Sequence, residues 1–241
     1  MTSKYARLDR FLSQRLGQSR REIQHLLAAG RVQVDGAVSR DGQQRVGPFS
    51  RVQLDTEVLQ ARQARYLMLN KPAGVVSATR DGKHPTALEL LGEQESDELH
   101  IAGRLDFNST GLMLLTNDGC WSRQLSAPQN NIRKHYRVTL EKALAEDYVQ
   151  AFAGGMFFEF EGITTRPARL EIISDHVADV WLVEGRYHQI KRMFGRFDNR
   201  VLTLHRVAIG GLQLDPTLPS GKARPLTAEE VRSVNPGYRP C

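Results

Sequence analysis

A change of sequence pattern near residue 65 most constrains how this chain of 241 residues folds. Before that point, apolar residues recur at the spacing of short helices; after it, segments such as YLMLN and HYRVTL cluster or alternate as strands do. The polar stretch TEVLQARQA, residues 56–64, has no periodic pattern and is typical of a linker. The sequence therefore predicts two compact units, residues 1–58 and residues 65–241, joined by a linker at 59–64.

The first unit carries signals for two short helices and a hairpin. Apolar residues recur at helical spacing from Leu8 to Leu16, and a capping-box pattern at Ser19 and Glu22 starts a second helix. The next segment, RVQVDGAV, alternates like a strand around Asp35-Gly36, which is a strong hairpin signal. We expect the apolar faces of these elements to pack together and leave the charged residues to solvent.

Positive charge is concentrated in this unit. Residues 1–65 carry 12 Lys and Arg against 6 Asp and Glu, whereas the rest of the chain is balanced and the formal net charge is +6. A basic module joined to a neutral body indicates docking on a polyanion, with an ordinary basic surface as the alternative. The side chains that we expect to meet phosphates are Arg10, Arg20, Arg21 and Arg31.

The second unit has the pattern of an α+β domain. Strand-like segments outnumber the two helical ones, KALAEDYVQAFAGG and HQIKRMFGRF, which favours an antiparallel or mixed sheet. The stretch NKPAGVVSAT predicts a strand, a turn and a second strand. The histidines and the two cysteines show no metal-ligand spacing, so no metal site is expected.

One loop of this unit carries the candidate chemistry. In GRLDFNSTGLMLLTNDG, residues 103–119, Asp106 lies between two expected strands and has no second acid beside it. Two-metal nucleases and glycosidases need several carboxylates, so both are disfavoured. A lone carboxylate can serve as nucleophile or base when a cation contacts it, and Arg104, Lys191 and Arg192 are the candidates. The alternative is a surface ion pair between Arg104 and Asp106.

Two resemblances to known families sharpen these expectations. Residues from about Ala6 to Asp55 resemble the S4 RNA-binding module. The stretch GRLDFNSTGLMLLTNDG resembles the active-site motif of pseudouridine synthases, in the branch that modifies ribosomal RNA and carries an S4 module in front. The segments NKPAGVVSAT, KHYRVTL and EGRYHQIKRMF follow the family order. Together the resemblance runs from about Ala6 to Val234 and implies an S4-like module followed by a catalytic domain with a large, mostly antiparallel mixed sheet.

The resemblance also implies an activity. Family members isomerise uridine to pseudouridine after flipping the base out of its stack, and they need no metal, redox group or organic cofactor. Asp106 would attack the sugar or the base, or take a ribose proton, and the sequence leaves these three roles open. Arg104 would hold the flipped conformation, Tyr136 would stack on the uracil and Lys191 would pair with the carboxylate. The expected RNA contacts or loop supports are Arg186, His188 and Arg192.

The expected partner is ribosomal RNA. Within the branch, EGRYHQIKRMF followed by LHRVAIGGLQL is most similar to enzymes that act on 16S RNA. A 23S or tRNA target and a non-catalytic RNA clamp are the alternatives, and naked RNA, an assembly intermediate and a finished subunit remain open as substrates. We expect a cytoplasmic monomer without membrane contact, because the N-terminus lacks a signal peptide, no apolar run reaches membrane-spanning length and no coiled-coil seam is present.

Overall fold

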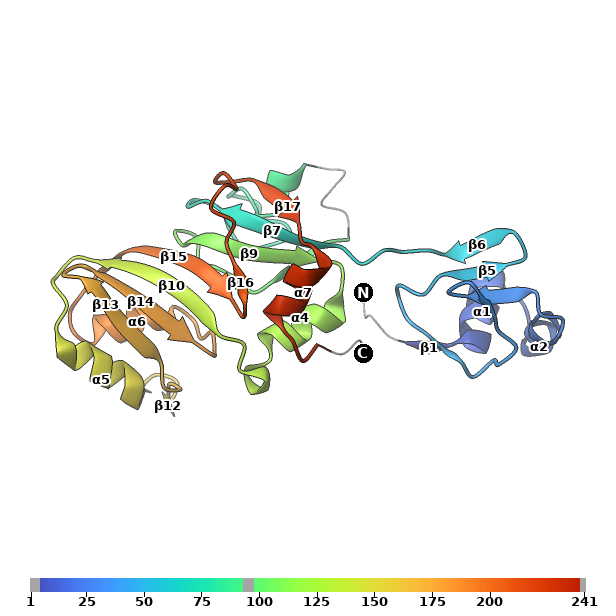
Figure 1. Cartoon of the computed structure of the whole chain (residues 1–241), viewed down its shortest axis with the longest axis horizontal. Coiled ribbons are helices and arrows are strands. Elements are labelled where there is room, and N and C mark those ends of the chain that lie inside the picture. The colour runs from blue at the N-terminus through green and yellow to red at the C-terminus, as the bar shows by residue number, and fades with distance from the viewer. Residues whose placement is uncertain (1–4, 93–97, 239–241) are drawn as a thin grey trace. The chain divides into compact units, whose positions relative to one another are not determined.

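The computed structural model describes residues 5–92 and 98–238. It has two compact units, one up to Ala64 and one from Arg65 onward, and Figure 1 shows that one stretch of chain without regular structure joins them. The outermost ends of the expected domains, residues 1–4 and 239–241, lie outside the described residues. Each unit has a hydrophobic core of its own. None of the described helices is long and apolar enough to cross a membrane.

The N-terminal unit forms the expected helices and hairpin. Its helices are α1 (Leu8–Leu16) and α2 (Arg20–Ala28), and its strands are β1 (Ala6–Arg7), β2 (Val32–Val34), β3 (Ala37–Val38), β4 (Arg45–Val46), β5 (Val52–Leu54) and β6 (Glu57–Gln60). The capping box of Ser19 and Glu22 is formed in both directions at the start of α2. Asp35 and Gly36 both have positive φ, 52° and 87°, as a tight hairpin turn between β2 and β3 requires. The predictions from local patterns are confirmed here.

The linker expected at residues 59–64 begins two residues too early, because β6 extends to Gln60. Residues Glu57–Gln60 form β6, which is antiparallel to β5 at the edge of a four-stranded sheet in the order β3-β2-β5-β6. The Gln60 side-chain amide donates to the carbonyl oxygens of Gly47 and Ser50, both at 2.8 Å. Only Leu59 of this strand is buried, so the polar edge strand shows too little alternation to be recognised. The connection without regular structure is residues 61–65.

The C-terminal unit is built on one large mixed sheet. Its main strand order is β13 (Arg169–Ser174), β14 (Val177–Leu182), β10 (Lys134–Leu140), β15 (Val201–Ile209), β9 (Thr110–Thr116), β7 (Tyr66–Lys71) and β17 (Ala223–Pro225). Two short strands pair outside this order, β16 (Leu212–Gln213) with β15 and β8 (His100–Ala102) with β9. Only the pairing of β9 with β15 is parallel among these described strands. The mostly antiparallel mixed sheet of an α+β fold is confirmed.

Helices cover both faces of this sheet. On one face lie α5 (Glu146–Gly154) and α6 (Gln189–Gly195), which share a core with Leu67 and Leu69 of β7. On the other lie α4 (Gly119–Ser126) and α7 (Ala228–Val234), which pack with Met68 (Figure 1). Because β7 and β9 are buried on both faces, their sequences are nearly continuous apolar runs. The remaining short elements are η1 (Glu89–Leu91), η2 (Pro128–Asn130), β11 (Phe157–Phe158) and β12 (Ile163–Thr164).

The second strand expected in NKPAGVVSAT does not form. Val76 makes only an isolated bridge to Thr86. The turn and the residues after it bond instead to the neighbouring loop that contains Asp106: the Gly74 amide donates to Phe107 O at 3.0 Å, and the Leu105 amide donates to Ser77 Oγ at 3.0 Å. The segment after Gly74 therefore bonds to the Asp106 loop rather than to a neighbouring strand, and it stabilises that loop.

The parallel contact between β9 and β15 joins the two parts of the sheet. It has two registered pairs, His205 with Thr110 and Arg206 with Gly111. Gly111 has φ +99°, and a Cβ atom there would lie 2.4 Å from the backbone oxygen of Arg206. Only glycine therefore allows the strands to approach this closely at the end of the Asp106 loop.

Replacing Gly111 by alanine should destabilise the C-terminal unit severely. Gly74 is the matched control, because its φ is also positive, at +77°, but a Cβ atom added there would have no neighbour within 4 Å. We expect Gly74→Ala to cost about 1 kcal/mol through its backbone conformation, and Gly111→Ala to cost a further 1–3 kcal/mol or so through the clash. Denaturant unfolding followed by tryptophan fluorescence measures this, since Trp121 and Trp181 both lie in that unit. Equal losses in the two variants would contradict the clash.

Candidate active site

Asp106 lies at the wall of a cavity of about 260 Å³. It belongs to the loop between β8 and β9, and its side chain is 29% exposed. The cavity is lined by Arg104, Leu105, Asp106, Ser109, Tyr136, Leu182, Gly185, Arg186, Tyr187, His188, Gln189, Ile190 and Leu204. Asp106 is the one carboxylate among these lining residues. The loop thus presents a single anion to a space that a small ring could enter.

Two basic side chains from the start of one helix contact that anion. Lys191 Nζ lies 3.2 Å from Asp106 Oδ2, and His188 Nε2 lies 3.5 Å from the same oxygen. His188 precedes α6 in a left-handed conformation, with φ 49°, and Lys191 lies in the first turn of that helix. Strained backbone of this kind is common at functional sites, where the surrounding structure holds it. The expected pairing of Lys191 with Asp106 is present, and His188 joins it.

Arg104 does not pair with Asp106. Its side chain is exposed and lines the cavity, and within residues 5–92 and 98–238 it takes part in no ion pair or side-chain hydrogen bond. The ion pair that two residues so close in sequence could have formed is absent from the described residues, and Lys191 of α6 supplies the cation instead. Arg104 therefore keeps its donors for a bound molecule.

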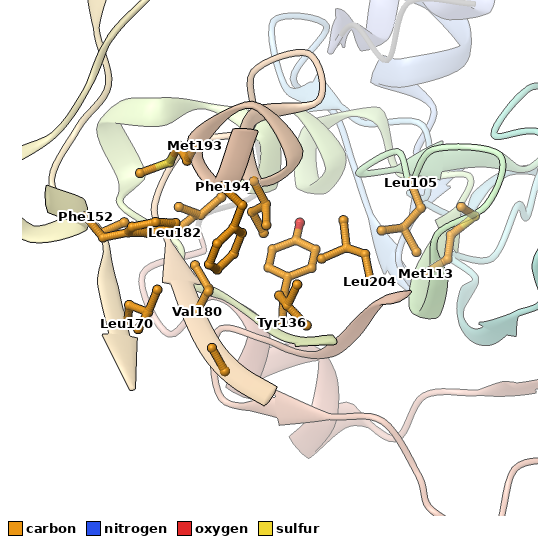
Figure 2. Close-up of a cluster of buried hydrophobic side chains, with 14 of the residues drawn as sticks. Leu105, Met113, Tyr136, Phe152, Leu170, Val180, Leu182, Met193, Phe194 and Leu204 are labelled. Atoms are coloured by element: carbon orange, nitrogen blue, oxygen red, sulfur yellow. The ribbon is translucent and has the colours of Figure 1, made fainter. Parts of the chain in front are cut away.

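Tyr136 forms part of the inner wall of the cavity. The residue is 9% exposed and belongs to β10. Figure 2 shows its ring among Leu182, Leu204 and Phe194, with the hydroxyl oxygen directed away from the strand. These apolar neighbours hold the ring in place at the cavity wall, where a flat base would meet it. The structure therefore brings Tyr136 to the same cavity as Asp106.

Lys71 holds the Asp106 loop through hydrogen bonds to its backbone. It is not among the residues that the sequence analysis selects. Its fully buried ammonium group donates to Ser109 O at 2.8 Å and to the carbonyl oxygens of Asp106 and Phe107, both at 3.2 Å. Burial lowers its pKa to about 8; the charge of Asp106 opposes this shift and that of Arg206 adds to it. The signal in the sequence was a lysine that ends an apolar strand and precedes Pro72.

Arg206 is the second residue that sequence reasoning missed. It lies in β15, is 2% exposed, and donates to backbone oxygens of Gly103, Arg104 and Leu112 at 2.7–3.2 Å. An arginine inside the apolar segment LHRVAI was the available signal, since such residues are rarely buried without partners.

The other expected RNA contacts separate into engaged and available side chains. Arg192 donates to both carboxylate oxygens of Glu161, and Arg31 donates to both of Asp55. Each guanidinium group therefore stabilises the unit that contains it. Arg31 does lie in solvent as expected, with its side chain 50% exposed, but Asp55 already binds its guanidinium group. Arg186 bonds Glu184 at 3.1 Å, yet it also lines the cavity. In contrast, no hydrogen bond or ion pair of the described residues engages the guanidinium groups of the exposed Arg10, Arg20 and Arg21.

Metal-ligating side chains do not gather around the cavity. In the described parts of the chain, no three of the histidine, cysteine, aspartate and glutamate side chains are grouped so that they could hold a metal ion. The groups present around Asp106 are instead one ammonium group, one imidazole, two guanidinium groups and two phenols. This set suits acid–base or nucleophilic chemistry on an organic substrate.

Comparison with known proteins agrees with this geometry. A family described as RNA pseudouridylate synthase matches residues 65–195, and the S4 domain family matches residues 6–52. Ribosomal small subunit pseudouridine synthase A of Pseudomonas aeruginosa is 56% identical over 229 residues, which is 95% of this chain and 100% of the relative. The protein of that name from Escherichia coli is 44% identical over 229 residues, 95% of this chain and 99% of the relative.

A solved structure supports the same assignment. The crystal structure of a pseudouridylate synthase superposes with a TM-score of 0.70 at 36% identity, and it covers 95% of this chain and 99% of its own. Both the sequence matches and this structural match extend across the N-terminal and the C-terminal unit. With its lone aspartate, cavity-lining tyrosine and S4 module in place, the chain belongs to the RNA pseudouridylate synthase family, whose members isomerise uridine in RNA.

Proposed function

We propose that the protein converts a uridine of 16S ribosomal RNA to pseudouridine at Asp106. The observation that carries this proposal is the Asp106 carboxylate itself, which faces a cavity beside Tyr136 and lies within 3.5 Å of Lys191 and His188. A uracil that left its stack would meet the carboxylate and the tyrosine ring together. Such an arrangement is what an enzyme acting on a flipped base needs.

The reaction is an isomerisation, so no atom is gained or lost. The bond from the ribose to the ring nitrogen breaks, the base rotates, and a bond from the ribose to carbon five forms while a proton passes from that carbon to the nitrogen. Asp106 is the group that acts on the nucleoside, and Tyr136 supports the base plane during rotation.

Three lines of reasoning support the 16S target, the monomeric state and the cytoplasmic location. The curated relatives named above are ribosomal small subunit enzymes that match this chain over nearly its whole length. The cavity and its basic side chains all come from one chain, so the site needs no second subunit. Ribosomal RNA is made and assembled in the bacterial cytoplasm, and that is where we propose the enzyme acts.

Replacing Asp106 by asparagine should abolish turnover while RNA binding persists. The amide keeps the size of the side chain but loses its charge and nucleophilicity, so we expect a loss of about a thousandfold or more. Asp147→Asn is the matched control, because Asp147 is exposed in the first turn of α5, outside the cavity lining. Pseudouridine formed in a 16S transcript is measured by chemical labelling and primer extension. Full activity of Asp106→Asn would contradict the proposal and favour a non-catalytic clamp.

The exposed arginines of α2 should determine the salt dependence of RNA binding. We expect the double variant Arg20→Gln/Arg21→Gln to lower affinity and to reduce the slope of log K against log salt by about 2, because each phosphate contact contributes about 1. Arg31→Gln is the control, since Asp55 already binds its guanidinium. Filter binding over a series of salt concentrations measures the slope. A slope unchanged by the double variant, or changed equally by Arg31→Gln, would remove α2 from the RNA-binding surface.

The choice of target is tested directly by substrate competition. We expect the purified protein to form pseudouridine in 16S transcripts and not in 23S or tRNA transcripts offered at equal concentration. Parallel reactions with naked 16S RNA, a protein-bound assembly intermediate and finished small subunits identify the preferred form. Product in 23S RNA or tRNA alone would overturn the 16S proposal and leave the isomerase assignment intact.

A further inference from the structure

Arg206 occupies the centre of the C-terminal sheet. It lies in β15, between β10 and β9, and it is in register with Tyr136 on one side and Gly111 on the other. Its side chain is almost completely buried, with 2% of the residue exposed. The residue therefore stands between the strand that carries the tyrosine and the strand that follows the Asp106 loop.

The guanidinium group of Arg206 joins both ends of that loop. Its Nε donates to Leu112 O at 2.7 Å, its Nη2 to Gly103 O at 2.9 Å and its Nη1 to Arg104 O at 3.2 Å. Gly103 and Leu112 flank the segment that contains Asp106, so one planar group fixes the distance between the two ends. Nη1 also lies 3.5 Å from the Tyr136 hydroxyl oxygen. The same side chain thus contacts the loop and the ring that line the cavity.

Burying the Arg206 guanidinium in this way lowers the stability of the fold. No carboxylate forms an ion pair with Arg206 within residues 5–92 and 98–238, and a buried cation that is satisfied only by carbonyl groups carries a large desolvation penalty. Its charge adds to the burial that lowers the pKa of both Lys71 and Lys134 to about 8. An apolar residue would fill the same place in the sheet without this penalty, so the guanidinium has a use other than packing.

We propose that Arg206 is a positioning residue that sets the place of Asp106 relative to Tyr136 for the isomerisation. The inference rests on the proposed function of Asp106 and goes beyond it, because Arg206 lies behind the loop, does not contact the carboxylate and is not itself among the residues that line the cavity. A planar group with donors on three nitrogens can hold three carbonyl oxygens at fixed angles, whereas an ammonium group acts as a point charge. The geometry, rather than the charge, is the feature that the site uses.

Two variants separate geometry from charge. Arg206→Lys keeps the charge but cannot reach all the carbonyl groups, and we expect kcat to fall about 100-fold, as for a catalytic group misplaced by roughly 1 Å. KM and RNA affinity should stay within about twofold, since no side chain of the cavity lining or of the S4 module is replaced. Arg206→Ala should lose more, and guanidinium ion below denaturing concentration should restore part of its turnover by filling the vacated place. The same salt should not restore Arg206→Lys, whose side chain occupies that place.

The controls keep this test distinct from that of the proposed function. Arg137→Ala is matched, because Arg137 comes from the neighbouring β10 but is exposed and bonds Asp179; its kcat should equal that of the unaltered protein. Inactivity of the unaltered protein on every RNA would defeat the proposed function, whereas a fully active Arg206→Lys would defeat this inference alone. Tryptophan fluorescence reports folding of each variant. Variants that unfold at the assay temperature and regain neither fold nor turnover with guanidinium would assign Arg206 to stability and overturn the proposal.

Discussion

The parallel contact between β9 and β15 is the constraint on which the active site depends. It is short, with two registered pairs, and it brings the end of the Asp106 loop against the strand that carries Arg206. The residues that meet there are far apart in sequence: the bond from Arg206 to Gly103 spans 103 positions. The entropy cost of loop closure over such a distance is offset only when both parts of the sheet are formed. The cavity therefore exists only in a completely folded C-terminal unit.

Local patterns determined how much of the fold the sequence could predict. The helices of the N-terminal unit, its hairpin at Asp35-Gly36 and the apolar strand β7 follow from capping, turn chemistry and burial on both faces, each readable within a few residues. The edge strand β6 was predicted wrongly because its polar sequence alternates too little, although its partner β5 is close in the chain. The strand expected after Gly74 was predicted wrongly because the turn and the residues after it bond to the distant Asp106 loop. Propensity gives only a weak preference at such places, and tertiary contacts override it.

The candidate site was predictable in its reacting group and only partly in its surroundings. Asp106 stood out as a lone acid between strands, and resemblance supplied Tyr136 and Lys191, which the structure brings to the same place. Closeness in sequence suggested Arg104 as the partner of Asp106, but neighbouring residues in a loop need not face each other. The sequence marked Lys71 and Arg206 as unusual but did not reveal their roles, because their partners are backbone oxygens that no residue type identifies.

Backbone carbonyl groups hold these two buried cations where acidic side chains commonly would. A carboxylate placed against Arg206 or Lys71 would have satisfied each charge more fully, yet it would have added a second anion near the cavity. With carbonyl partners, the cations stiffen the loop and Asp106 remains the one carboxylate among the lining residues. The positive potential of the site is then left for Asp106 and for the phosphates of an incoming RNA strand. The same bonds that fix the loop therefore also keep its surroundings attractive to a polyanion.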